Sequence, residues 1–543
     1  MSKIADYLRE HIIGEVSANS AVRERFSTDG SIFEITPQVV VYPRVIDDVR
    51  KIARFSWQLA ERKKTVPITP RGAGNSQTGA AIGEGVILAF PAHMNKLLEL
   101  DTKKNYVSVQ PGINYRVLQD TIKTHGRFIP PFPGSADCAT IGGAIGSNSA
   151  GLRSVKYGTT SQYVNSLKVV LSNGELIETG RVSKRELNRK KGLATFEGEI
   201  YRQLDGLIVD NWDLIQTIPR NTAQNSSGYA LADVKQKDGS FDLTPLLTGS
   251  EGTLGIIVQA ELSIAPNNMD RTLVVAGFEN IDQITAALPD ITKLEPATLE
   301  MLSGGALDWI EDNYPHHLAG LVDKPFPGAL LLVEFDDLGR STQSKKAKKL
   351  TRILRKITED FQVADDYDER EELWKIRESV ALLAAHGEGS AQALPIINDG
   401  VVPVGQLSEF YTGLMALLKK HELDPVIWGS IGDGRLSTLP LIGMDTVGGR
   451  QKIFKLKDAH AQLVTRLGGS VAASQGDGRL NTPYMSALYG EEVFKLLQAT
   501  KKVFDPHAIL NPGVKFGTQR ADQLQSLRQS YQPSIPAHFI ALD

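Results

Sequence analysis

Residues 130–158, PPFPGSADCATIGGAIGSNSAGLRSVKYG, form a stretch that is rich in glycine and poor in large side chains. We expect a loop here. Glycine accepts positive φ and has no Cβ, so such a loop lets backbone N–H groups approach a ligand closely. Successive N–H groups that point one way form a concave site for anions, phosphate above all. A flexible linker or a run of β-turns would have the same composition, so other parts of the chain must decide.

Two further glycine-rich loops lie next to predicted strands, PRGAGNSQTGA at 70–80 and TGSEGTLG at 248–255. The chain has no G-x-G-x-x-G between a strand and a helix and no G-x-x-x-x-G-K-[ST], so the common dinucleotide and triphosphate motifs are missing. Three such loops at one sheet edge could enclose a long ligand with a central pyrophosphate, and Arg71 could add a charge. Three unrelated turns are the alternative.

Composition limits the classes of protein. A length of 543 residues predicts two or three domains. A net charge of −3 gives no reason to expect nucleic acid as a partner. The single cysteine, Cys138, excludes an internal disulfide and a cysteine-ligated iron–sulfur cluster within the chain. The start lacks an apolar signal region and no run reaches the roughly 20 apolar residues of a membrane span, so we expect a cytoplasmic protein without a transmembrane segment.

The periodicity of apolar residues predicts a mixed chain. Short strands and helices, one of them starting at Asp47, alternate before residue 130, and a hairpin follows residue 158. The stretch 246–264 is interpreted as strand, glycine loop and strand. A helix is expected from Ser341 to Phe361, with its lysines on a solvated face. A late helix ends at Asp505-Pro506, and residues 517–543 are expected to form an irregular polar tail.

One sequence repeats. SIGDGRLST at 430–438 returns as SQGDGRLNT at 474–482, with seven of nine positions identical. Each copy could be a turn that presents an Asp and an Arg at one place. Gly-Asp-Gly is also a favoured turn sequence, so the repeat alone does not assign a role.

Together these segments resemble the vanillyl-alcohol oxidase and p-cresol methylhydroxylase (PCMH-type) flavoproteins. PRGAGNSQTGA resembles their pyrophosphate loop, the 130–158 stretch their second flavin loop, and LLTGSEGTLGIIVQAEL their third. The C-terminal part resembles the branch of D-lactate dehydrogenase, the glycolate oxidase flavin subunit and D-2-hydroxyglutarate dehydrogenase. That likeness rests on WKIRE at 374–378, the two GDGR loops and FDPHAILNPGVK at 504–515.

The resemblance implies an α+β fold. An FAD-binding domain of two subdomains (residues 1–268) would precede a cap domain with an antiparallel sheet and flanking helices (269–482). A C-terminal helix would then return to the FAD domain, followed by the polar tail (483–543). The residues implied in FAD binding are Pro70, Arg71, Gly72, Ala73, Gly74, Asn75, Ser76, Gly79, Pro133, Gly134, Ser135, Thr140, Ile141, Gly142, Gly143, Gly146, Ser147, Asn148, Gly151, Tyr157, Glu251, Gly252, Gly255, Ile256, Ile257 and Asn511.

We expect non-covalent FAD. Relatives with a histidyl link carry His where this chain has Asn75. A doubly linked branch has Cys in C-P-T-V-G, which CATIG at 138–142 resembles, but cysteine near this position also occurs where FAD is held without a bond. We therefore interpret Cys138 as a packed or loop thiol.

Oxidation of a 2-hydroxy acid needs a hydride acceptor, a cation for the carboxylate and a base for the hydroxyl proton. The resemblance assigns the first role to the flavin and the second to Arg377, which could instead form a structural ion pair. The predicted catalytic set is Arg377, Asp433, Arg435, Asp477 and Arg479. Either Asp433 or Asp477 could be the base, and His386 is another candidate. Two structural Asp–Arg turn pairs are the alternative.

The family's metal site is altered. Metal-dependent relatives have H-x-G-D-G-N-x-H followed by E-H-G, whereas this chain has Ser430, Ser437, Ser474 and Gln475 at those metal-binding positions. Hydroxyls are poor ligands for Zn or Mn compared with imidazole and carboxylate, so we predict no metal.

The predicted function is an FAD-dependent oxidoreductase acting on the CH–OH group of a small, anionic substrate, a 2-hydroxy acid or a sugar-like molecule. The electron acceptor would be a quinone, a partner protein or oxygen, and peripheral membrane contact stays open. The alternative is a flavin-binding subunit or scaffold of a redox complex that has lost the alcohol chemistry. An aldonolactone-type oxidase is disfavoured because its C-terminal H-x-x-K motif is not found.

Overall fold

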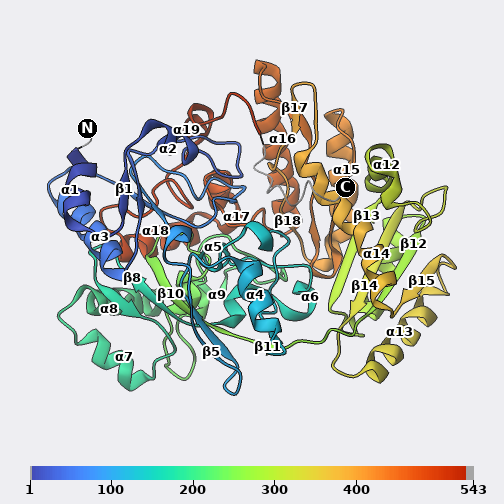
Figure 1. Cartoon of the computed structure of the whole chain (residues 1–543), viewed down its shortest axis with the longest axis horizontal. Coiled ribbons are helices and arrows are strands. Elements are labelled where there is room, and N and C mark those ends of the chain that lie inside the picture. The colour runs from blue at the N-terminus through green and yellow to red at the C-terminus, as the bar shows by residue number, and fades with distance from the viewer. Residues whose placement is uncertain (1–2, 533–543) are drawn as a thin grey trace.

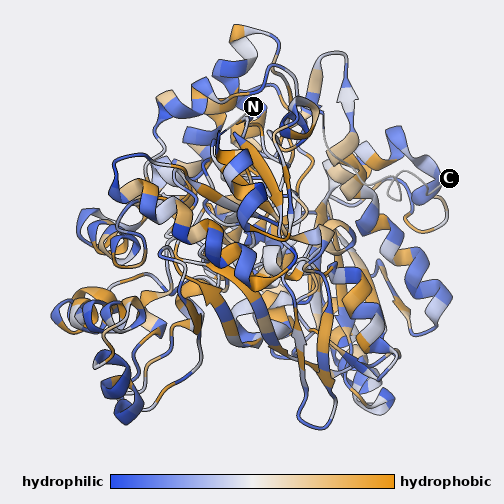
Figure 2. Cartoon of the chain, turned by 60° about the vertical axis from the view of Figure 1, so that its left-hand side comes forward, coloured by the Kyte–Doolittle hydropathy of each residue, from blue (hydrophilic) through white to orange (hydrophobic). Residues whose placement is uncertain are grey.

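The computed structural model describes residues 3–532. Figure 1 shows two regions joined along a central seam, with the N-terminal strands and helices on the left and a separate sheet with its helices on the right. Apolar residues concentrate in the strands inside each region, and the outer faces of the covering helices are hydrophilic (Figure 2).

The first subdomain is a four-stranded sheet in the order β1 (Glu15–Ser17), β2 (Val39–Tyr42), β4 (Val86–Ala89) and β3 (Ile68–Arg71). β4 runs parallel to both β2 and β3. Strands that run in the same direction need a crossover connection, and α3 (Ile46–Glu61) supplies the one that leads from β2 to β3, on the two sides of β4. The first predicted loop leaves the C-terminal end of β3.

The second subdomain is a five-stranded antiparallel sheet. Its strand order is β5 (Leu97–Asp101), β6 (Tyr106–Val109), β10 (Ile256–Ser263), β8 (Val164–Val170) and β9 (Leu176–Glu178). α4 (Tyr115–Lys123) and α8 (Phe196–Asp210) contribute to the core of this subdomain. The second predicted loop lies between β7 (Arg127–Phe128) and β8, and the third precedes β10.

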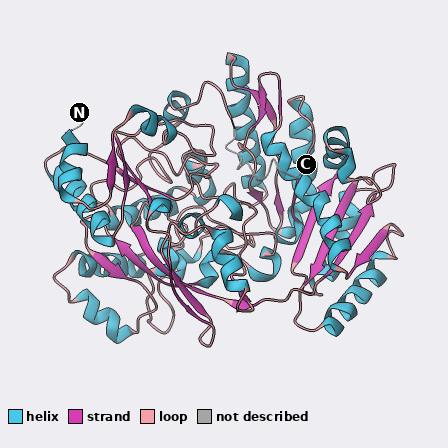
Figure 3. Cartoon of the chain, in the orientation of Figure 1, coloured by secondary structure: helices cyan, strands magenta, loops and turns pink. Residues whose placement is uncertain are grey.

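The cap domain contains another five-stranded antiparallel sheet, shown on the right of Figure 3. The order is β15 (Phe361–Ala364), β12 (Thr272–Phe278), β14 (Ala329–Phe335), β13 (Thr298–Ser303) and β19 (Trp428–Ser430). Alternate residues of β12 serve two cores. Val274 and Ala276 pack with α11 (Ile281–Thr292), α13 (Arg340–Leu354) and α15 (Leu407–Lys420), whereas Leu273 and Val275 pack with α12 (Gly304–Asn313) and α14 (Tyr367–Ser379).

The chain then returns to the first region. After α16 (Val447–Arg466), α18 (Glu491–Phe504) packs on α8. The segment that follows lies against β3, where Ile68 N donates to Ile509 O at 2.7 Å and Asn511 N donates to Ile68 O at 2.8 Å. The predicted α+β architecture with an antiparallel cap sheet and a returning C-terminal helix is therefore present. The boundaries at 268/269 and 482/483 stay predictions.

Four predictions of local structure were wrong. Residues 130–158 are not wholly a loop, because they contain α5 (Ile141–Ser147) and α6 (Ser154–Tyr157). The Thr140 side chain caps α5, and Ile141, Ala144 and Ile145 fall on one buried face. The predicted first strand of 246–264 is a short helix, α10 (Thr244–Leu247), with proline near its start.

The predicted 341–361 helix ends at Leu354, and Phe361 begins β15 instead. This segment pairs antiparallel with β12 and becomes the edge strand of the cap sheet, so sheet pairing between distant segments overrides the helical periodicity here. The expected irregular tail contains α19 (Arg520–Gln525), and Leu527 and Tyr531 after it are buried against the rest of the chain. Residues 533–543 of that tail lie outside the described part.

Candidate functional site

A cavity of about 1700 Å³ lies where the three glycine-rich loops meet the cap domain. Pockets for a single drug-sized ligand measure roughly 300–1000 Å³, so this cavity has room for a large cofactor and a second molecule. Its walls come from both regions of the chain: the loops after β3, around α5 and before β10 on one side, and residues of the cap on the other.

The first loop presents backbone donors. Within residues 3–532, the amides of Ala73 to Gln77 donate no hydrogen bond to a protein acceptor. Gly74 has φ of +76°, and a Cβ there would lie 2.2 Å from Nη2 of Arg71. The Arg71 guanidinium itself donates to Phe26 O at 3.3 Å and Ala81 O at 3.2 Å, so it also supports the loop from beneath. Free successive amides at a strand end suit an anionic group.

The second loop is fixed to the segment before α4, and the third loop is fixed to the second. Gly142 N donates to Pro111 O at 2.8 Å, and a Cβ on Gly142 would lie 2.6 Å from the Pro111 side chain. Gly249 N donates to Ile145 O, and Glu251 N donates to Gly146 O, both at 2.8 Å. The third loop therefore rests on the α5 backbone, where the missing side chain of Gly146 leaves Glu251 close to the helix.

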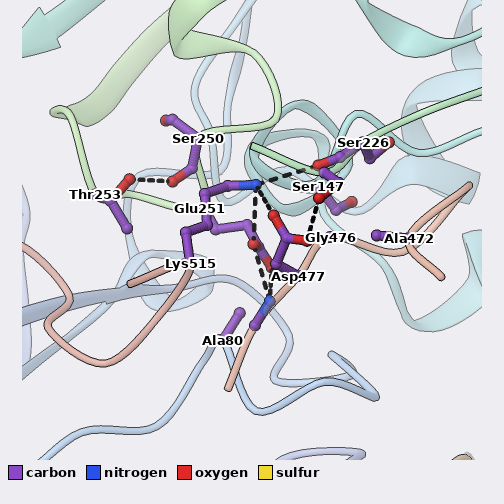
Figure 4. A network of polar contacts seen from close by, with 12 residues as sticks. Ala80, Ser147, Ser226, Ser250, Glu251, Thr253, Ala472, Gly476, Asp477 and Lys515 are labelled. Atoms are coloured by element: carbon purple, nitrogen blue, oxygen red, sulfur yellow. Dashed lines mark hydrogen bonds and ion pairs between the residues drawn. The ribbon is translucent and has the colours of Figure 1, made fainter. Parts of the chain in front are cut away.

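A buried ion network lies under the loops (Figure 4). Lys515 Nζ lies 2.9 Å from Asp477 Oδ2 and 3.4 Å from Glu251 Oε2, and it also donates to Ser226 O at 3.1 Å. All three side chains are nearly inaccessible to solvent. Burial disfavours the lysine charge, but the attraction of Asp477 and Glu251 outweighs it and raises the pKa of Lys515.

Most of the predicted cofactor residues line the cavity. These are Pro70, Arg71, Gly72, Ala73, Gly74, Asn75, Ser76, Pro133, Gly134, Ser135, Thr140, Gly142, Gly143, Gly146, Ser147, Gly151, Glu251, Gly252, Gly255 and Ile257. The remaining ones lie behind the wall: Gly79, Ile141, Asn148, Tyr157, Ile256 and Asn511.

Asn511 illustrates what a residue behind the wall does. Its Nδ2 donates to Ala80 O at 2.9 Å and to Glu251 O at 2.8 Å, and its Oδ1 accepts from the Thr69 hydroxyl at 3.0 Å. One side chain thus joins β3 and two of the loops. The wide cavity, the free amides and these fixed glycine loops fit a large cofactor with a central pyrophosphate.

Asp433 and Asp477, the predicted bases, do not line the cavity. Asp433 is 2% exposed and accepts from Gln224 Nε2 at 2.7 Å, from Ser430 Oγ at 2.9 Å and from the Ser154 hydroxyl. Burial raises its pKa. Asp477 accepts from Ser227 Oγ and Gly228 N, both at 2.7 Å, besides Lys515. These partners favour the structural alternative for both carboxylates.

The three predicted arginines differ in whether they reach the cavity. Arg479 lies behind the wall and donates to Ile82 O at 3.0 Å, while its Nε has no partner among the described residues. Arg377 lines the cavity, but its Nε lies 2.7 Å from the carboxylate of Glu300, a side chain with no exposure. Arg435 lines the cavity, is 9% exposed, and its Nε has no hydrogen-bond partner among the described residues. It forms no ion pair within residues 3–532 either.

The buried carboxylate of Asp399 feels the charge of Arg435 but is hydrogen-bonded to backbone amides. Asp399 accepts from the amides of Ala473 at 2.8 Å, Ser474 at 3.2 Å and Gln475 at 2.7 Å. Burial raises the pKa of Asp399, and the charge of Arg435 acts in the opposite direction. Arg435 is therefore a buried cation whose donors are available to a ligand in the cavity.

The serines at the altered metal positions are hydrogen-bonded to the protein. Ser437 Oγ donates to Asn398 O at 2.8 Å, Ser474 Oγ to Asp399 at 3.2 Å, and Ser430 Oγ to Asp433 at 2.9 Å. Across residues 3–532, no three His, Cys, Asp or Glu side chains gather closely enough to hold a metal ion.

Sequence reasoning missed His317, which lines the cavity from the short helix Pro315–His317. Its Nδ1 lies 2.6 Å from Ser379 Oγ, and that hydroxyl donates to Lys375 O at 2.6 Å. Because the serine proton is used in this way, Nδ1 must be the donor, which leaves Nε2 as an acceptor. Burial lowers the pKa of His317, and His316 and Lys375 add to the effect. No sequence motif marks this residue.

Cys138 lines the same cavity. Its Sγ lies 3.9 Å from Nδ2 of Asn75, and burial raises the pKa of its thiol. The prediction of non-covalent cofactor binding stays a prediction.

Comparison with known proteins identifies the two regions. Residues 37–180 match the FAD binding domain, and residues 267–514 match the C-terminal domain of FAD linked oxidases. The chain carries both domains of the FAD-linked oxidases. FAD, the predicted cofactor, is the one that this domain pair binds, and the predicted family is confirmed.

Similar curated proteins include two hydroxy-acid enzymes. The chain is 30% identical to D-2-hydroxyglutarate dehydrogenase of Pantoea ananatis, with 92% of this chain and 50% of the relative covered. It is 29% identical to glycolate oxidase subunit GlcD of Bacillus subtilis, with 89% and 90% covered. The chain therefore spans about half the length of the D-2-hydroxyglutarate dehydrogenases that it matches first, and most of the length of the glycolate oxidase subunit.

Among solved structures, p-cresol methylhydroxylase with bound substrate superposes with a TM-score of 0.66 at 15% identity, covering 94% of this chain and 96% of that one. This likeness confirms the PCMH-type fold. None of the helices within residues 3–532 is both long and apolar enough to cross a membrane.

Proposed function

We propose that this FAD-linked oxidase is an FAD-dependent oxidoreductase that oxidises the CH–OH group of a small anionic substrate, a 2-hydroxy acid in the first instance. One observation carries the proposal. The cavity walled by the FAD loops extends to Arg435, a buried cation whose donors have no protein acceptor among the described residues. The names of the relatives, which are 2-hydroxy-acid enzymes, support the same reaction class.

The residues that would bind FAD lie in the three glycine-rich loops. The free amides of Ala73 to Gln77 would bind the pyrophosphate, and the loop around α5 with Gly252 and Ile257 would enclose the rest of the molecule. Bound FAD would supply the acceptor for the hydride of the carbinol carbon.

The cap domain would supply the cation for the substrate carboxylate and the base for the hydroxyl proton. Arg435 would bind and orient the substrate carboxylate, since a guanidinium matches a carboxylate in a two-point contact. His317 would accept the hydroxyl proton at Nε2, because Ser379 fixes the tautomer that leaves this nitrogen free. Arg377 would act mainly as a positioning residue, held by Glu300.

The proposal includes a reaction without a catalytic metal. The hydroxyls of Ser430, Ser437 and Ser474 donate to protein acceptors, and neutral hydroxyls are weak ligands for Zn or Mn. We further propose a cytoplasmic enzyme whose electrons pass to a quinone, a partner protein or oxygen, since the single cysteine cannot hold an iron–sulfur cluster.

The test uses the purified yellow holoprotein under anaerobic conditions. Mixing with a panel of 2-hydroxy acids and sugar acids should bleach the flavin with at least one of them, and added Zn or Mn should leave the rate unchanged. A yellow protein that no member of the panel bleaches would favour the alternative, a flavin-binding subunit or scaffold without alcohol chemistry. A colourless protein that takes up no FAD would refute the cofactor assignment, and a large metal activation would refute the metal-free reaction.

A further inference from the structure

One wall of the cap side is a short hairpin with alternating faces. Trp428 N donates to Ser437 O at 3.1 Å, and Ser437 N donates to Trp428 O at 2.7 Å, so the two residues are direct cross-strand partners. Side chains alternate along a strand, and Arg435, Ser437 and Leu439 therefore share a face with Trp428. All four line the cavity, whereas Leu436 packs into the core on the other side.

From Arg435 to Leu439 this face changes from charged to apolar. Arg435 is followed by the hydroxyl of Ser437 and then by Leu439, with Trp428 beside the hydroxyl. Trp428, Leu439 and Val380 belong to one apolar cluster, and Leu382 and Ala384 pack against it. A ligand anchored at Arg435 can therefore extend along an apolar surface.

A second wall is apolar and partly lined by small side chains. In the short helix Val380–Ala385, Ala381, Ala384 and Ala385 line the cavity together with Val380 and Leu382. Alanines leave volume that larger residues would fill, and apolar ones gain free energy when they cover apolar ligand surface. The second arginine on this side, Arg377, is already neutralised by Glu300 at 2.7 Å. The cap side thus offers one available buried cation beside an apolar surface.

We propose that the substrate is a 2-hydroxy monocarboxylate whose carbinol carbon carries an apolar chain or ring of several carbons. The proposal rests on the oxidoreductase function proposed above and narrows its substrate class. The carboxylate binds Arg435, and the apolar substituent lies along Leu439, Trp428 and Ala384. Glycolate and lactate lack the surface to cover this wall, and a dicarboxylate would place its second charge against apolar side chains.

The test is a homologous series with the holoprotein: glycolate, lactate, 2-hydroxybutyrate, 2-hydroxyhexanoate, 2-hydroxyoctanoate and 3-phenyllactate, with 2-hydroxyglutarate as the dicarboxylate. The second-order rate constant of anaerobic flavin bleaching should rise by up to about fourfold for each buried methylene. Bleaching by 2-hydroxyglutarate should be slower than by 2-hydroxyhexanoate. Calorimetry should show octanoate, which cannot be oxidised, binding at least tenfold more tightly than acetate.

Ala384→Phe fills the proposed space. Its loss of rate should grow with chain length and reach about tenfold for 2-hydroxyoctanoate. Ala286→Phe is the matched control, since Ala286 is exposed on α11 and does not line the cavity, and it should change neither rate nor binding.

Two outcomes contradict the proposal in different ways. A rate that is flat or falls with chain length, with Ala384→Phe affecting all substrates equally, would overturn the substrate class while the oxidoreductase function stands. Bleaching by no hydroxy acid, together with equal affinity for octanoate and acetate, would overturn both.

Discussion

The two sides of the cavity are built by different means. The FAD side uses backbone: free amides in the first loop, the glycines of helix α5, and a carbonyl of α5 that accepts from the amide of Glu251. The cap side uses side chains: Arg435, His317 and an apolar wall. Changes on the first side should therefore act through folding and FAD affinity, and changes on the second side through substrate alone.

Buried charge shows the same difference. Lys515 forms ion pairs with two carboxylates beneath the loops, so its charge stabilises the fold. Arg435 is also buried, at 9% exposed, but it faces the cavity and has no acid within ion-pair distance in the described chain, so its charge is available to a ligand there. A buried charge with partners stabilises a fold, whereas a buried charge that lines a cavity without a partner indicates a ligand.

The largest effect is expected at Lys515. Lys515→Met leaves Glu251 and Asp477 buried without their cation, which should lower the free energy of unfolding by about 3–5 kcal/mol. Chemical denaturation of the apo and FAD-bound protein measures this. The exposed neighbour Lys502→Met on α18 should change it by less than about 0.5 kcal/mol. A loss below about 1 kcal/mol for Lys515→Met would break the comparison on its structural side.

His317 comes next. His317→Asn should lower kcat/KM by about 100-fold without changing FAD affinity, because it removes the proposed base. Since the pKa of His317 is lowered and the neutral form is the base, the wild-type rate should fall only below about pH 6.5, and the variant should lose this acid limb. His316→Asn should cost less than about threefold. An unchanged acid limb in His317→Asn would remove this residue from the chemistry.

Arg435 sharpens the comparison from the cap side. Arg435→Met should lower kcat/KM by about 10- to 150-fold through loss of a charge-assisted contact, with Arg435→Lys retaining part of the activity. Thermal stability should fall less than in Lys515→Met, because Arg435 forms no ion pair within residues 3–532 and acts on the buried carboxylates of Asp399 and Asp433 only through its charge. If the variant instead loses as much stability as Lys515→Met and keeps its kcat/KM, Arg435 is structural.

Gly74 gives the smallest effect. Gly74→Ala would place a side chain at φ of +76° and 2.2 Å from Arg71, which should weaken FAD binding by about tenfold. Equilibrium titration of the apoprotein with FAD measures this. Gly206→Ala on α8, where a new Cβ meets no atom within 4 Å, is the control and should bind FAD normally. Equal FAD affinity in both variants would deny the first loop its role.

The sequence predicted the FAD side well because that side depends on local patterns. A loop that needs glycine at fixed positions can be recognised from the spacing of its glycines, as in Pro70–Ser76. Most of the predicted FAD-binding residues line the cavity. The helix α5 was missed because its glycines masked the buried spacing of Ile141, Ala144 and Ile145. Glycine-rich composition predicts loop, and tertiary packing overrides that preference.

The cap side was harder to predict for a different reason. The two GDGR copies have the same sequence but face different surroundings. Asp433 and Asp477 turn into buried networks, Arg479 binds a carbonyl behind the wall, and Arg435 reaches the cavity. Which side chain reaches the ligand depends on strand pairing between distant segments, such as Trp428 with Ser437, and a short motif does not encode that pairing.

The most direct test of the central claim is a crystal structure of the FAD-bound protein with 2-oxooctanoate, the product of a proposed substrate. FAD should lie against the loops at Gly72–Ser76, with the carboxylate of the ligand within hydrogen-bond distance of Arg435 and its alkyl chain against Leu439 and Ala384. A carboxylate bound elsewhere, a metal at the Ser430, Ser437 and Ser474 positions, or a ligand outside the cavity would contradict the account.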